Sequence, residues 1–153
     1  MLNFLKPKTE PGWLSVALRD GRVDLVHLRR ETGHRPRVTL ADSVEKRDGD
    51  LPTLSALKRS VGLGRFRCTA LLNHGQYQMI QASAVDGAPD EAREVMRWQL
   101  KDQVEFPVDN AAIDLLPIPS DGRSPQVFAA IAAEAVVAPL VQAFQEARVP
   151  LAA

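Results

Sequence analysis

The feature that most constrains the fold is the segment of residues 88–119, which predicts a helix, a sharp break and a strand in immediate succession. Pro89 suits the first turn of a helix, because the amide that proline lacks would have no intrahelical partner there. Phe106 and Pro107 end the helix, since the residue before a proline is driven out of the α region. Residues 111–118 then predict a strand. At about 100° per residue, one half of the helical wheel carries the apolar side chains Ala92, Val95, Met96, Leu100 and Val104.

Trp98 departs from this pattern, because it lies in the middle of the charged half of the helix. A tryptophan there either packs against the following strand or loop, or stays exposed as an anchor for a partner protein. Tryptophan and arginine are enriched in interface hot spots, and Arg97 is its neighbour. Phe106 and Pro107 allow two similar interpretations. Either they contact a partner protein, or they only set the direction in which the chain leaves the helix. We therefore predict a small docking lobe whose candidate partner-binding residues are Arg97, Trp98, Phe106 and Pro107.

The same segment resembles a stretch of the PilM/MshI family, which comprises actin-like cytoplasmic proteins of type IV and mannose-sensitive hemagglutinin (MSHA) pilus assembly. The resemblance covers the helix, the Phe-Pro break and the strand in order, and over the rest of the chain it is one of pattern only. The matching residues are Met96, Arg97, Trp98, Gln99, Gln103, Val104, Phe106, Pro107, Val108, Asp109, Ile113 and Asp114.

The resemblance implies an α+β fold, namely the N-terminal lobe of an actin-like (ribonuclease H-like) ATPase with a small inserted subdomain. We expect a loose leader over residues 1–12 and a main subdomain over 13–82 and 124–153, incomplete at its C-terminus. The inserted subdomain is expected over 83–123. In the family a strand and a second half follow the last helix, so the chain is expected to correspond to the first half only.

Hydrophobic periodicity along the chain predicts the order βββαββαββα, which is typical of a sheet carrying helices. Asp20-Gly21 between two strand-like runs is a strong hairpin signal, and Asn73-His74-Gly75 is expected to join a second pair of strands. Gly62 is well placed to stop a helix. The predicted strands are 13–18, 23–28, 37–41, 65–72, 77–83, 111–118 and 126–132, and the helices are 51–61, 89–104 and 136–147, the last starting near Val136 to accommodate Pro139.

The first hairpin bears on nucleotide binding, because the resemblance implies a phosphate-binding loop at this place. Matching residues 23–28 to the family's second strand puts the loop's aspartate at Ala17 and its serine run at residues 20–22. An aspartate in the turn would repel phosphate, although Arg19 or Arg22 beside it could still bind a phosphate group. The alternative is that this segment is a plain hairpin turn. The cofactor stays open: the resemblance implies that a full-length relative could bind ATP and magnesium, but without the aspartate and the second lobe we expect no ATPase here. The remaining nucleotide-site candidates are Arg19, Asp20, Gly21 and Arg22.

Composition excludes several classes of protein. Lys plus Arg and Asp plus Glu balance at 19 each, so no net field favours nucleic acid. A single cysteine, Cys68, cannot form an internal disulfide, suits a reducing compartment and cannot complete a zinc site with the scattered histidines. No apolar run approaches the ~18 residues of a membrane span, and the N-terminal apolar run is too short for a signal peptide.

The resemblance therefore implies a cytoplasmic scaffold at the inner-membrane face, membrane-associated only through its partners. Its expected partners are the short cytoplasmic tail of a PilN-like inner-membrane assembly protein and the pilus assembly ATPase. In the family that tail lies between the main body and the small subdomain. Two alternatives stay open: an ATP-binding or ATP-hydrolysing actin-like protein, and the cytoplasmic part of a GspL-like type II secretion protein.

Overall fold

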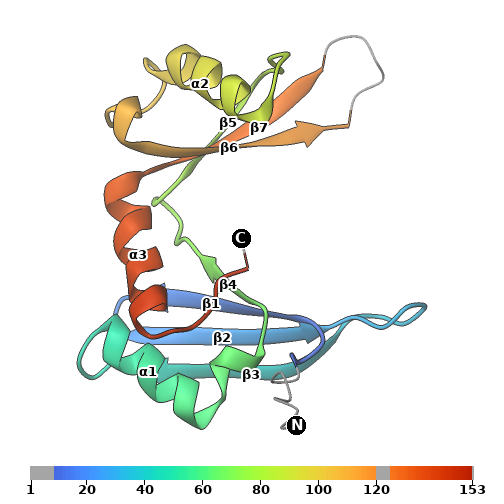
Figure 1. Cartoon of the computed structure of the whole chain (residues 1–153), viewed down its shortest axis with the longest axis vertical. Coiled ribbons are helices and arrows are strands. Elements are labelled where there is room, and N and C mark those ends of the chain that lie inside the picture. Colours follow the sequence, from blue (N-terminus) through green and yellow to red (C-terminus); the bar gives the residue numbers. More distant parts are fainter. Residues whose placement is uncertain (1–8, 120–124, 153) are drawn as a thin grey trace, which may run out of the picture. The chain divides into compact units, whose positions relative to one another are not determined.

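The computed structural model describes residues 9–119 and 125–152 (Figure 1). The chain divides into two compact units, the first formed by Met1–Asn73 with Leu140–Ala153 and the second by His74–Pro139. The predicted order of strands and helices is confirmed, with two short 3₁₀ turns added. The second unit is larger than the expected insertion of 83–123, because the strand 111–118 within that range pairs with the strand 126–133, which in turn pairs with the strand 78–83.

The first unit is built on a four-stranded sheet in the order β3-β2-β1-β4. Asp20 and Gly21 form the predicted two-residue turn between β1 and β2, and Gly21 has a positive φ of 72°. β4 pairs in parallel with β1, while the other pairs are antiparallel. The elements are β1 Trp13–Arg19, β2 Arg22–Arg29, β3 Arg37–Glu45, α1 Asp50–Ser60, a 3₁₀ turn Leu63–Arg65 and β4 Cys68–Leu71.

Alternation along β1 and β2 sends apolar side chains to the face of this sheet that the helices cover. Phe144 comes from the last helix, α3 (Glu134–Glu146), and is fully buried in the same core. Gly62 adopts a left-handed conformation with φ 77° just after α1, as expected of a helix stop. Beyond α3, Leu151 forms a parallel bridge with Cys68 of β4. The core includes Leu14, Val16, Val23, Leu25, Leu54, Leu57 and Phe144.

The second unit is a three-stranded antiparallel sheet in the order β5-β7-β6, and Figure 1 shows helix α2 lying along one of its faces. Met96 and Leu100 of α2 are fully buried against Val127 and Ala129 of the central strand. Of the predicted apolar half of the helix, Ala92, Met96 and Leu100 face the core, whereas Val95 is exposed. The elements are β5 Gln78–Ser83, α2 Pro89–Leu100, a 3₁₀ turn Val108–Asn110, β6 Ala111–Ile118 and β7 Gln126–Ala133.

Three local expectations are corrected. The strands around Asn73-His74-Gly75 are not a pair, because β4 joins β1 in one sheet and β5 joins β7 in the other. Helix α2 ends at Leu100 rather than at residue 104, and turns follow it. Helix α3 begins at Glu134, so Pro139 lies inside it and not in its first turn. There the missing amide cannot bond to the carbonyl of the preceding turn.

Candidate functional site

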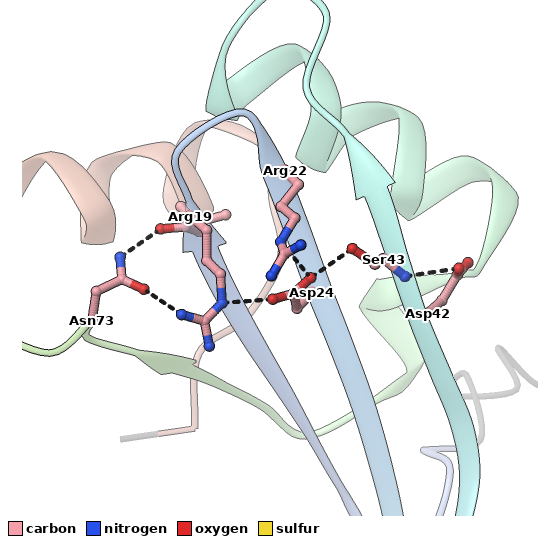
Figure 2. Close-up of polar contacts among 7 residues, drawn as sticks. Arg19, Arg22, Asp24, Asp42, Ser43 and Asn73 are labelled. Carbon is pink, nitrogen blue, oxygen red and sulfur yellow. Dashed lines mark hydrogen bonds and ion pairs between the residues drawn. The ribbon is translucent and has the colours of Figure 1, made fainter.

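The turn of the first hairpin carries a polar network in which both arginines face an aspartate (Figure 2). Arg19 Nε donates to Asp24 Oδ2 at 2.6 Å, and Arg22 Nε lies 3.4 Å from Asp24 Oδ1. Ser43 Oγ donates to Asp24 Oδ1 at 2.7 Å. The hydrogen bond from Ser43, followed by the contacts with the two arginines, holds the pKa of Asp24 below its ordinary value.

The same network ties the hairpin to the end of β4. Asn73 Nδ2 donates to the carbonyl of Leu18 at 2.9 Å, and Arg19 Nη1 donates to Asn73 Oδ1 at 3.4 Å. Asp20 and Gly21 are exposed at the turn, and Ala17, where the family has its aspartate, is buried. The four predicted nucleotide-site residues thus lie together, but the two arginines among them are paired with the carboxylate of Asp24. A role for them in nucleotide binding stays a prediction.

The side chain of Arg97 extends from α2 and links this helix to the start of β6. Its Nη1 donates to the carbonyl oxygens of Val108 and Ala111, the second at 2.9 Å. Its Nε lies 3.5 Å from Glu94 Oε1, and its side chain is only 19% exposed. Hydrogen bonds from a charged donor are stronger than neutral ones, so this predicted partner-binding residue also holds the lobe's own backbone in place.

Phe106 and Pro107 form the corner between α2 and β6. Phe106 is half-buried and packs against the cluster formed by Val108, Ala111 and Ile131. Pro107 is exposed and extended, with φ −60° and ψ 121°, and it caps the following 3₁₀ turn. This geometry fits the reading in which the corner sets the exit angle of the chain, and a contact of either residue with a partner stays a prediction.

Trp98 is mostly exposed, at 64%. Val95 lies three residues earlier on α2 and is 43% exposed; residues at this spacing are neighbours on a helix surface. We call this pair the Trp98 strip. Exposed Glu91 and Glu94 lie on the same helix. A fully buried inner side and an exposed tryptophan on the outer side are what a docking helix requires.

A second exposed apolar surface lies on the face of the β5-β7-β6 sheet that α2 does not cover. Leu116 pairs directly with Phe128, while their neighbours Leu115 and Ala129 point to the helix side. Met79 pairs with Ala130, which lies on the same face as Phe128. The sequence did carry a signal for this face, because β7 is apolar at nearly every position rather than alternating. We call Met79, Leu116 and Phe128 the open sheet face; they are 45%, 47% and 39% exposed.

Other chemistry has little support in the part of the chain that the structure describes. Cys68 is fully buried, and burial raises the pKa of its thiol to about 11. Within residues 9–119 and 125–152, no group of three or more His, Cys, Asp or Glu side chains is arranged to hold a metal ion. None of the described helices combines the length and the apolar character needed to cross a bilayer.

No protein-family model matches the chain, and no curated protein matches it in sequence. It is similar to a structure of the PilM-PilN type IV pilus biogenesis complex, with a TM-score of 0.65 and 20% identity over 96% of this chain and 47% of that one. It is also similar to the cytoplasmic domain of EpsL, an inner membrane component of the type II secretion system of Vibrio cholerae. That match has a TM-score of 0.65 and 12% identity over 92% of this chain and 55% of the other.

The chain thus spans about half the length of each of these proteins. At these identities the likeness establishes the fold, and the predicted PilM-like, actin-like lobe is confirmed.

Proposed function

We propose that this actin-like lobe is part of a cytoplasmic scaffold at the inner-membrane face, and that it binds the cytoplasmic tail of a PilN-like assembly protein. The finer proposals are that the machine is a type IV pilus of the MSHA type and that the scaffold also contacts the pilus assembly ATPase. The fold similarity to a protein from a PilM-PilN complex supports this class of partner.

The observation that carries the proposal is the exposure of Trp98 on a helix whose opposite side is completely buried. A large aromatic side chain gains most when a partner removes it from water, and tryptophan is the residue type most enriched in interface hot spots. The open sheet face adds three further apolar side chains in the same unit. An extended tail with alternating apolar residues is the kind of ligand that such surfaces accept.

The proposal is tested by isothermal titration of the full chain with a synthetic peptide of the PilN-like tail from the same genome. We expect binding by the unmodified protein and a loss of affinity of about 30-fold or more for Trp98→Ala, because hot-spot truncations cost about 2 kcal/mol or more. Val38→Ala is the control, since Val38 is an apolar residue of the first unit with a similar exposed fraction, 59%. No binding of the tail, or equal losses in the two variants, would overturn the proposal.

A GspL-like secretion protein is the second candidate, because the EpsL domain matches with the same TM-score. Titration with the cytoplasmic tails of type II secretion proteins from the same genome discriminates the two, since the tail bound more tightly identifies the system.

We further propose that this lobe does not hydrolyse ATP, which the alanine at position 17 and the pairing of Arg19 and Arg22 with Asp24 support. The test is phosphate release from magnesium-ATP, which should stay at the rate without protein. A rise in melting temperature with magnesium-ATP would show separately that the nucleotide binds the native state.

A further inference from the structure

A groove between β3 and α1 in the first unit is a second place where the chain presents recognition chemistry. Its cavity volume is about 570 Å³, and its apolar lining comes from Val44 on the strand and from Ala56, Leu57 and Val61 on the helix side. A smaller cavity of about 330 Å³ shares Val61 and continues past Leu40. The groove therefore follows β3 along much of its length.

The outer wall of this groove is the outer edge of β3. Within residues 9–119 and 125–152, the order β3-β2-β1-β4 gives β3 a strand neighbour on one side only. Lys46 N–H donates to Gly21 O at 2.8 Å, so Lys46 turns its backbone toward the first hairpin. In an antiparallel pair the direction of the backbone groups alternates; those of Ala41, Ser43 and Glu45 therefore point outward. The amide of Ser43 agrees with this, because it donates to Asp42 Oδ1 and not to β2.

The rim of the groove is acidic. Asp42, Glu45 and Asp48 line it, and Arg47 is the cation among its lining residues. Among the ion pairs of the described residues, none involves these three carboxylates, whereas nearby Asp50 is paired with Lys46 at 2.7 Å. Three carboxylates against one guanidinium leave the rim with a net negative charge that a basic ligand would complement.

We propose that this groove binds an extended, basic segment of a partner protein, which adds as a strand to the free edge of β3. Strand addition takes its affinity from main-chain hydrogen bonds and its specificity from pockets for alternate side chains. Apolar side chains of the segment occupy the lining around Val44, Leu57 and Val61, and lysine or arginine side chains meet Asp42, Glu45 and Asp48. β3 has nine residues, so a segment of about eight residues at ~3.4 Å per residue covers its length.

The site belongs to the first unit and is independent of the Trp98 strip and the open sheet face. Its failure in an experiment therefore leaves the proposed tail binding untouched, and the reverse also holds.

The test is fluorescence anisotropy of the full chain with three labelled eight-residue peptides that alternate valine with lysine, with glutamate or with serine. We expect the valine–lysine peptide to bind at least about tenfold more tightly than the valine–glutamate peptide, with the serine peptide between them. Binding of the lysine peptide should weaken as salt rises, because rim charges are partly screened.

Two variants separate edge pairing from simple charge attraction. Ala41→Pro removes an outward amide but no hydrogen bond of the β2–β3 ladder, and proline is tolerated at such edge positions; Ala41→Thr is its matched control. Asp42→Lys reverses one rim charge, and Asp102→Lys makes the same change at an exposed position of the second unit. Melting temperatures are compared first, so that only folded variants enter the titration.

We expect Ala41→Pro and Asp42→Lys each to lower the affinity for the valine–lysine peptide by about fivefold or more. Both control variants should bind this peptide as tightly as the unmodified chain does. Equal affinity for all three peptides, or no effect of Ala41→Pro, would overturn the proposal. A concentration-dependent dimer that Ala41→Pro abolishes would also overturn it, because the edge would then be occupied by a second copy of the chain.

Discussion

Replacement of Arg97 by alanine should destabilise the second unit far more than replacement of Arg93, four residues earlier on the same helix. Arg97 Nη1 donates to the carbonyl oxygens of Val108 and Ala111, and both of these residues are buried. Hydrogen bonds from charged groups contribute about 1.5–3 kcal/mol each, and a buried acceptor left unpaired costs about 1–3 kcal/mol. Because one side chain serves both carbonyls, we expect a loss of about 2–4 kcal/mol.

Arg93 is the matched control because its partners are solvated. It pairs with Asp90 at 2.6 Å and lies 3.6 Å from Asp114, and both aspartates are mostly exposed. Exposed ion pairs contribute about 0–1 kcal/mol, so Arg93→Ala should change little. Arg97→Lys should fall between the two alanine variants, since an ammonium keeps the charge and can donate hydrogen bonds but is more strongly hydrated than a guanidinium.

The assay is urea unfolding followed by circular dichroism, together with hydrogen exchange of the β6 amides. Arg97→Ala should lower the free energy of unfolding and speed exchange at residues 111–118 in particular, because the start of β6 is where the guanidinium attaches. Equal destabilisation by Arg93→Ala and Arg97→Ala, or unchanged exchange in β6, would refute the reasoning.

Three further predictions concern stability, thiol chemistry and pH. Met96→Ala should cost about 2–5 kcal/mol because the side chain is fully buried, whereas Trp98→Ala should change the unfolding free energy by less than about 0.5 kcal/mol. Cys68 should resist iodoacetamide at pH 8 in the native state and react once urea exposes it, because burial keeps its pKa at about 11. Asp24 has a lowered pKa, so its contribution to stability is present above its unfolded pKa and is lost as the pH falls through the folded value; Asp24→Asn should flatten that acid-side dependence in unfolding titrations.

The elements that local chemistry determines were predictable from the sequence. The Phe106-Pro107 break and the Pro117–Pro119 stretch bracket a strand, and β6 begins and ends at the predicted residues. The Asp20-Gly21 turn and the left-handed Gly62 follow from the conformations that glycine permits. In each case the signal and the structure lie within a few residues of each other.

Features that depend on distant partners were not predictable in this way. The sequence of a strand does not determine which strand it pairs with. The apolar segments before Asn73 and after Tyr77 were therefore predicted to form one pair, although they join different sheets. Arg97 lies on the polar half of the helical wheel, yet its long side chain reaches back to two carbonyls of the following segment. The sequence left two alternatives for Trp98, and only the packing of the inner helix side shows that the tryptophan stays outside.

The open sheet face links the composition of β7 to the proposed function. A strand that needs only one covered face has polar residues at alternate positions, but β7 places Phe128 and Ala130 on the face away from α2. Exposed apolar side chains gathered on one face are typical of a surface that another molecule covers. Phe128→Ser with Leu116→Ser should then lower the unfolding free energy by only about 1–3 kcal/mol, because both side chains are partly exposed, while weakening calorimetric binding of the tail peptide strongly. A large loss of stability with intact tail binding would instead make this face an internal structural surface, and the Trp98 strip alone would have to account for recognition.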